Sequence, residues 1–86
     1  MKYRHTKNTV STETNNTFII LNIKSGFYFE IEGTSAFVWR CISENFDSQE
    51  IIEKAQSKYK DNGNIKDDIK AFIDDLLEEE LIEEFN

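Results

Sequence analysis

One stretch of fourteen residues, GFYFEIEGTSAFVW at positions 26–39, constrains the fold more than any other part of the chain. Its first half alternates apolar with polar side chains, which is the two-residue period of a half-buried strand. The apolar positions are Phe27, Phe29 and Ile31, and the alternating positions are Tyr28, Glu30 and Glu32. Gly33 ends this pattern, and we expect Thr34 to cap a helix that carries Trp39 into the core.

The residues before this stretch also have strand patterns. Residues 9–14 are rich in β-branched side chains and suit an edge strand. Residues 18–23 are apolar on both faces, so we expect both faces to be covered at least in part. Turns are expected at residues 15–16 and 24–26, the latter with Gly26 at positive φ. Together with a strand at 27–31, these segments predict an N-terminal antiparallel sheet of three strands.

Helical patterns follow the sheet. The first helix is predicted over residues 34–43, the second over 48–59 and the third over 65–79. Asp47, with Glu50 three residues later, forms the sequence pattern of a capping box before the second helix. The fold class expected is therefore α+β, with a winged helix-turn-helix outline.

The third helix carries two neighbouring columns of side chains at helical spacing. The first column is apolar and consists of Ile65, Ile69, Phe72 and Leu76. The second column consists of Lys66, Lys70, Ile73 and Leu77. After this helix, Leu81 and Ile82 form an apolar tail that is expected to fold back on the sheet.

Chain length and composition limit the architecture. Eighty-six residues support one domain, residues 1–86, in which the polar residues 1–8 are expected to be flexible. No run of eighteen apolar residues occurs, so no membrane span is expected. The N-terminal residues contain no apolar signal region, and a lone Cys41 excludes an internal disulfide. These features favour a cytoplasmic protein.

The net charge of −7 is distributed unevenly along the chain. Residues 1–46 contain five Lys/Arg and four Asp/Glu, a balance of +1, whereas residues 47–86 contain five Lys and thirteen Asp/Glu, a balance of −8. Nucleic-acid affinity comes largely from neutralising phosphates, and an acidic half repels them. Nucleic acid is therefore not an expected partner.

Few groups are suited to catalysis or metal binding. The only histidine, His5, falls in the segment expected to be flexible, and Cys41 at mid-helix is interpreted as a small buried hydrophobe. No His/Cys cluster has zinc-site spacing. The loop around Gly63 fails as a calcium loop, because the alignment puts Lys58 and Lys60 at the first two ligand positions. We expect no enzyme activity, no cofactor and no metal.

From position 26 onward, a set of residues resembles the PqqD family. The aligned positions are Gly26, Tyr28, Phe29, Ile31, Glu32, Thr34, Ala36, Val38, Trp39, Asp47, Glu50, Ile51, Phe72, Ile73, Leu76, Leu81 and Ile82. The resemblance covers residues 17–83, mostly through packing residues. It implies a small recognition element of ribosomally synthesised, modified peptides (RiPPs), which binds the leader of a precursor peptide.

Two positions depart from the family pattern. Glu32 stands where the family usually has Asn, so the corner between strand and helix is expected to be built differently. Glu80 stands where a glycine usually ends the last helix, so that helix is expected to fray or run on.

A binding groove can be predicted on physical grounds as well. If residues 27–31 form a sheet edge, their unpaired backbone groups can accept an extended peptide, and the third helix can form the opposite wall. Lys66 and Lys70 would then receive acidic leader residues; alternatively, Lys70 pairs with Asp67 and Asp74. Tyr28 is either a surface tyrosine or a contact. The expected peptide-binding residues are Phe27, Tyr28, Phe29, Glu30, Ile31, Lys66, Ile69, Lys70, Phe72, Ile73 and Leu76.

The function expected from the resemblance is non-enzymatic. The chain would bind the leader of a precursor peptide and present it to a modifying enzyme or leader protease, with the lasso-peptide type favoured over the quinone-cofactor type. One alternative is a winged-helix DNA-binding regulator, although residues 66–79 hold two Lys against six Asp/Glu. Another is a generic adaptor or dimerisation module. We expect a monomer or a swapped dimer.

Overall fold

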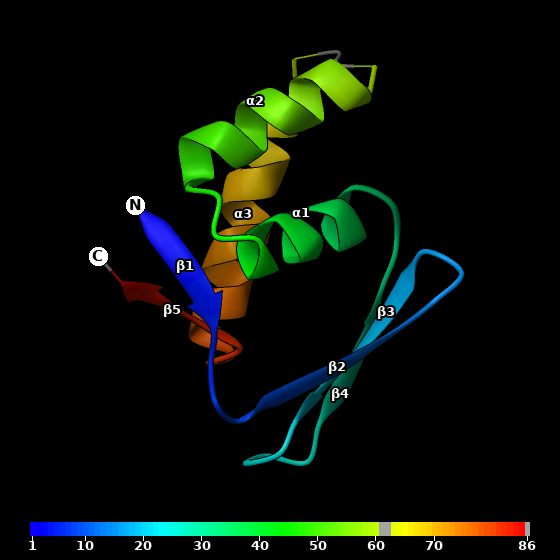
Figure 1. Ribbon diagram of the computed structural model, residues 1–86, viewed down its shortest axis with the longest axis vertical. Coiled ribbons are helices and arrows are strands. Elements are labelled where there is room, and N and C mark those ends of the chain that lie inside the picture. The colour runs from blue at the N-terminus through cyan, green and yellow to red at the C-terminus, as the bar shows by residue number, and fades with distance from the viewer. Residues whose placement is uncertain (61–62, 86) are drawn as a thin grey trace.

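The main sheet is built from three consecutive strands. The computed structural model describes residues 1–60 and 63–85. Its strands β2 (Thr9–Thr14), β3 (Thr17–Asn22) and β4 (Tyr28–Ile31) form one antiparallel sheet in the order β2-β3-β4 (Figure 1). This confirms the predicted three-stranded sheet, with boundaries shifted by one residue at β3 and β4.

Two tight turns set the register of these strands. Asn15 and Asn16 both have positive φ, 49° and 66°, which suits the two-residue turn that joins β2 to β3. Gly26 has a φ of 80° in the turn between β3 and β4, as predicted. The turn chemistry in the sequence therefore accounts for the hairpins.

Three helices follow the sheet, as predicted: α1 (Gly33–Ser43), α2 (Ser48–Lys58) and α3 (Ile65–Glu78). The predicted capping box before α2 is confirmed. The Glu50 backbone N–H donates to Asp47 Oδ1 at 2.8 Å, and the Asp47 N–H donates to Glu50 Oε1 at 3.1 Å. The predicted loop before α3 includes residues 61–62, which lie outside the described residues.

The corner between β4 and α1 differs from the prediction. Thr34 does not cap α1, because the helix already begins at Gly33 and its N-cap is Glu32. The Glu32 side chain makes no capping hydrogen bond. Gly33 has a φ of 63°, a left-handed conformation that favours glycine, so the chain turns one residue earlier than the threonine signal suggested.

The two ends of the chain form a second sheet that the sequence did not predict. Strand β1 (Lys2–His5) pairs antiparallel with β5 (Ile82–Phe85), with His5 opposite Ile82. The expectation that residues 1–8 are flexible is therefore wrong for β1. The apolar tail after α3 does fold back: Thr9 Oγ1 of β2 donates to the Leu81 carbonyl at 3.2 Å, and Ile82 pairs with β1. Tyr3 and Ile82 are both buried, so this small sheet also contributes to the core.

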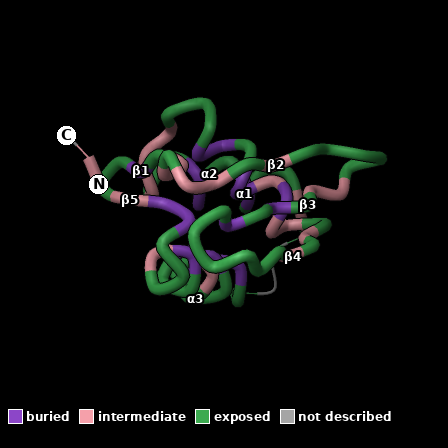
Figure 2. Tube along the Cα trace, turned by 90° about the horizontal axis from the view of Figure 1, so that it is seen from below, coloured by how far each residue is buried: buried purple, intermediate pink, exposed green. Residues whose placement is uncertain are grey.

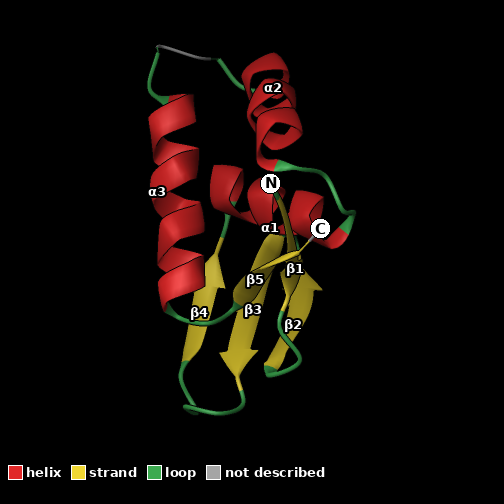
Figure 3. Cartoon of the chain, turned by 90° about the vertical axis from the view of Figure 1, so that its left-hand side faces the viewer, coloured by secondary structure: helices red, strands yellow, loops and turns green. Residues whose placement is uncertain are grey.

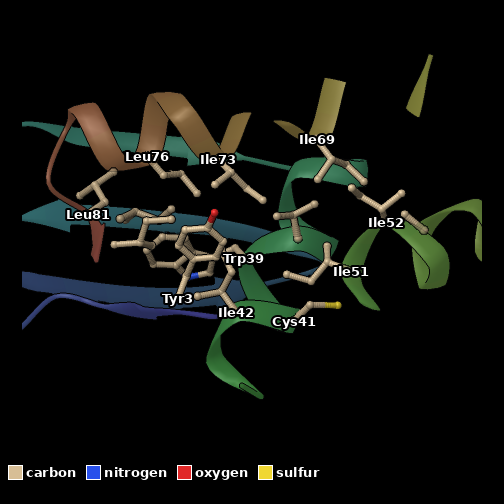
Figure 4. Packing of buried hydrophobic residues seen from close by; sticks show 14 of the residues in the cluster. Tyr3, Trp39, Cys41, Ile42, Ile51, Ile52, Ile69, Ile73, Leu76 and Leu81 are labelled. Atoms are coloured by element: carbon tan, nitrogen blue, oxygen red, sulfur yellow. The ribbon is translucent and has the colours of Figure 1, made fainter. Parts of the chain in front are cut away.

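Trp39 lies at the centre of the core, as predicted. Its side chain is 1% exposed, and its indole Nε1–H donates to Ser11 Oγ at 3.2 Å. Figure 4 shows Ile73 and Leu76 of α3 projecting toward the layer that contains Trp39 and Tyr3. Tyr3 comes from β1, so the core joins elements from both ends of the chain.

His5 is ordered by its contact with Trp39, which corrects its assignment to a flexible tail. The two rings stack with centroids 3.7 Å apart at 13°, and His5 Nε2 donates to the Trp39 carbonyl oxygen at 3.3 Å. Burial lowers the pKa of His5, and this hydrogen bond opposes that effect in part. Cys41 is buried, as predicted, and burial raises the pKa of its thiol.

One face of the main sheet packs on the core, and the other remains open to solvent. Val10, Leu21 and Tyr28 lie opposite one another on β2, β3 and β4, and all three are exposed. Figure 2 shows buried residues gathered toward the helices. Among the described residues nothing covers this outer face, so the predicted partial cover on both faces is wrong. No described helix is long and apolar enough to span a membrane.

Helix α3 ends sharply at a residue under backbone strain, which corrects the expected fraying. The Leu81 N–H donates to the Leu76 carbonyl at 3.0 Å, and the Glu80 N–H donates to the Leu77 carbonyl at 3.1 Å. This is the Schellman arrangement, and it requires a left-handed residue after the C-cap. Glu80 occupies that position with a φ of 59°.

We predict that Glu80→Gly stabilises the protein by about 0.5–1 kcal/mol, because glycine removes the left-handed strain but adds backbone entropy to the unfolded chain. Urea unfolding measures the change in unfolding free energy. Glu80→Ala is the matched control: like glycine it loses the exposed ion pair with Lys24, yet it retains the strain. Equal stability of the Gly and Ala variants would contradict the explanation.

We predict that stability falls as the pH decreases from 7.5 to 5.5. The pKa of His5 is depressed in the folded state, so below about 6.5 the unfolded chain binds a proton more readily than the folded chain does. The contribution of neutral His5 to folding stability is complete above the pKa that His5 has in the unfolded chain. It is lost as the pH falls through the pKa that His5 has in the folded protein. In His5→Phe, which retains a stacked ring, unfolding measurements should show a clearly smaller loss over this range.

Candidate functional site

Strand β4 has one free edge. Among the described strands it pairs only with β3, and the Asn22 N–H donates to the Phe27 carbonyl at 2.9 Å. Backbone groups of successive residues in a strand point to opposite sides. Phe29 and Ile31 therefore point their backbone groups toward β3, while Tyr28 and Glu30 present theirs at the free edge.

A hollow of about 270 Å³ lies between this edge and α3, and we call it the α3–β4 groove. Figure 3 shows α3 alongside β4 at this side of the sheet. The groove is lined by Ile20, Phe29, Ile31, Phe72, Asp75, Leu76, Glu78, Glu79 and Leu81. Its walls are therefore mainly apolar, and its polar lining consists of carboxylates from the last turns of α3.

A smaller hollow of about 180 Å³ continues along α3 toward its N-terminus. It is lined by Thr34, Ser35, Val38, Asp68, Ile69 and Phe72. Phe72 borders both hollows, so they adjoin at this side chain, and we call the two together the apolar track. The residues that line it run from the end of α3 to the beginning of α1.

Asn22 ties the turn of the β3–β4 hairpin to α3. Its side chain is 6% exposed, and its Nδ2 donates to the Glu79 carbonyl at 3.1 Å. Its Oδ1 accepts from the backbone N–H groups of Lys24 at 3.0 Å and Ser25 at 3.2 Å. One amide thus satisfies backbone groups of the hairpin turn and of the end of α3, and its bond to Glu79 ties the two together.

The structure brings together part of the predicted contact set. Phe29, Ile31, Phe72 and Leu76 line the groove, and Ile69 lines its continuation. The backbone groups of Tyr28 and Glu30 face the free edge. Ile73 is buried in the core, outside both hollows, and Phe27 precedes β4 and is 68% exposed, so its predicted inward position is wrong.

Lys66 and Lys70 are not brought to the groove. They share a stripe of α3 with Leu77, because residues four and seven apart lie on one helix face. Leu77 lines a separate hollow against the loop after β1 and against β5. Neither lysine takes part in an ion pair within the described residues, so the alternative pairing of Lys70 with Asp67 or Asp74 is not seen either.

The sequence interpretation missed several groove residues. Asn22 carried a usable signal, since a polar amide in an otherwise apolar strand needs buried hydrogen-bond partners. Asp75, Glu78 and Glu79 carried none, because only the rotation of α3 against β4 determines which of its many carboxylates meets the groove.

The two hollows on α2 and against β1 and β5 are lined mainly by polar side chains. An open hollow of about 520 Å³ lies on α2, lined by Phe37, Glu53, Lys54, Ser57 and Lys58. In the described part of the chain, no three His, Cys, Asp or Glu side chains gather as a metal site. The α3–β4 groove is the place where apolar pockets and unpaired backbone groups coincide, so it is the best candidate for a binding site.

Most of the chain matches one protein family. Residues 17–82 match the family described as coenzyme PQQ synthesis protein D (PqqD), which is well over half of the chain. The chain belongs to the PqqD family. A comparison with curated protein sequences gives no match.

Two solved structures share the fold of this PqqD-family chain. One is TbiB1 in complex with the TbiA(beta) leader peptide, which is 21% identical with a TM-score of 0.87, covering 96% of this chain and 98% of TbiB1. The other is lasso peptide synthetase B1 complexed with the leader peptide, 18% identical with a TM-score of 0.85, covering 98% of this chain and 100% of that one. At these identities the likeness establishes the fold.

We predict that Asn22→Ala destabilises the protein by about 2–3 kcal/mol, because three backbone groups lose a hydrogen-bond partner. Asn22→Asp is the informative companion, since a carboxylate can still accept from the hairpin turn but cannot donate to Glu79 when ionised. We expect urea unfolding to show that Asn22→Asp loses at least as much unfolding free energy as Asn22→Ala does. A near-native Asp variant would mean that the bond to Glu79 contributes little.

Proposed function

We propose that this PqqD-family chain binds the leader segment of a ribosomally synthesised precursor peptide by adding it as a strand to the free edge of β4. The observation that carries the proposal is the coincidence of that edge with the apolar α3–β4 groove. A strand placed there pairs with Tyr28 and Glu30 through its backbone and points alternate side chains toward Phe29, Phe72 and Leu76.

The comparisons support this proposal. The two solved structures reported above are complexes with a leader peptide, and one of those proteins is a lasso peptide synthetase B1. On this basis we favour a role in lasso-peptide biosynthesis for this chain as well. Its groove has the features that strand addition needs, independently of the likeness.

Strand addition divides the recognition into two parts. Backbone hydrogen bonds to the β4 edge give affinity for any extended peptide, whereas the apolar pockets select side chains at every second position. Residues of the groove contact only one face of the added strand. The chain therefore recognises a short pattern and leaves the rest of the precursor accessible.

The role that we propose is presentation. The chain holds the leader in the cytoplasm while a modifying enzyme or leader protease acts on the precursor, and it contributes no catalytic group itself. The chemistry of the described residues fits this role: Cys41 is buried with a raised pKa, and His5 is stacked on Trp39 with a lowered one. Neither group lines the groove.

We predict that Glu30→Pro weakens binding of the cognate leader about three- to tenfold, because it removes an N–H at the free edge, where a strand tolerates proline. Calorimetric titration measures the affinity. Glu30→Ala retains the N–H and should bind nearly as well as the native chain.

Amide-shift mapping with the same leader locates the site. We expect shifts at residues 28–31 and along the groove side of α3. Shifts confined to α2, or equal affinities of the Pro and Ala variants, would refute strand addition at β4.

A further inference from the structure

We infer that the leader segment recognised by this chain carries two basic residues four positions apart, with an apolar residue midway between them. This inference rests on the proposed function and specifies the chemistry of the ligand. It follows from the charges along the α3–β4 groove and from their spacing on α3.

Carboxylates border the apolar track at both ends. Asp75, Glu78 and Glu79 line the groove, and Asp68 lines its continuation. All four are exposed, and the ion pairs of the described residues include none of them. Their negative charges therefore remain available to a ligand in the track.

No cation lies between these acids. The described residues that line the two hollows include no Lys, Arg or His. Lys66 and Lys70, the only basic residues of α3, lie on the stripe that faces the other side. An acidic leader would meet only like charges here, whereas a basic one would meet opposite charges at both ends.

The spacing of the acids matches that of an extended strand. At about 1.5 Å per residue, Phe72 is about 6 Å along α3 from Asp68, and the midpoint of Asp75 and Glu79 is about 13.5 Å from it. Inward-facing positions of a strand recur about every 6.8 Å, so positions i, i+2 and i+4 span about 13.6 Å. The first and last positions thus meet carboxylates, and the middle one meets Phe72.

The side chains of Lys and Arg suit the two outer positions. Their aliphatic stems can pack along the apolar walls while the charged ends remain at the hydrated carboxylates. A small or β-branched apolar residue at the middle position fits against Phe72 and Phe29. The pattern expected in the leader is basic-x-apolar-x-basic.

Three synthetic nine-residue peptides test the pattern on the full-length protein. Each peptide has a five-residue core, Lys-Thr-Leu-Thr-Lys, Gln-Thr-Leu-Thr-Gln or Glu-Thr-Leu-Thr-Glu, and threonine at its other positions. Amide shifts of the protein during titration measure affinities in the millimolar range. We expect the Lys peptide to bind at least tenfold more tightly than the Glu peptide, with the Gln peptide between them. Added salt should reduce the difference, because the charges are exposed.

Paired variants attribute this preference to the groove. Asp68→Asn with Asp75→Asn removes one acid at each end of the track, and should reduce the Lys-over-Glu preference about five- to tenfold. Asp67→Asn with Asp74→Asn is matched in charge, spacing and helix, but neither residue lines a hollow, so the preference should change little.

The outcomes separate the two proposals. Equal binding of the three peptides, tighter binding of the Glu peptide, or equal effects of the two double variants would overturn the basic pattern while leaving strand addition intact. If no peptide shifts residues 28–31 and the cognate leader does not either, strand addition itself fails.

Discussion

The hydrogen bonds of the Asn22 side chain tie the turn of the β3–β4 hairpin to the end of α3. The amide is the point where the β3–β4 hairpin and the end of α3 share buried polar partners. The two bonds from the turn hold the amide in place, and the bond from Nδ2 to Glu79 crosses to α3. Leaving such groups unsatisfied in a buried place is costly, so the hairpin cannot move away from α3 without losing the bond to Glu79. The free edge of β4 therefore faces the apolar side of α3 in a preformed arrangement, which reduces the ordering cost of binding.

The end of α3 also determines how the chain closes. A left-handed Glu80 reverses the backbone, so that β5 returns beside β1. This pairing brings Tyr3 and His5 to the core, where His5 covers one face of Trp39. A strained residue at a helix end is tolerated here because the sheet and the core that it makes possible stabilise the same conformation.

Affinity and specificity have different sources in this groove. In the binding mode that we propose, the backbone edge of β4 binds any extended chain, the pocket around Phe72 adds a preference for apolar side chains, and the acids at its ends add a preference for charge. Exposed charges contribute little energy each, but they discriminate well against like-charged peptides. A small domain can thus select one leader without enclosing it.

Local patterns in the sequence determined most of the fold. The alternation from Tyr28 to Ile31, the paired asparagines at residues 15–16 and the Asp47 capping box each specify backbone geometry within a few residues, and all were found as predicted. Contacts between distant residues had no such signal. The pairing of β1 with β5, the stacking of His5 on Trp39 and the rotation of α3 that turns Asp75 toward β4 and Lys70 away depend on packing between elements. The sequence therefore determined that a strand edge and an amphipathic helix exist, and only the tertiary structure decided which side of that helix forms the groove.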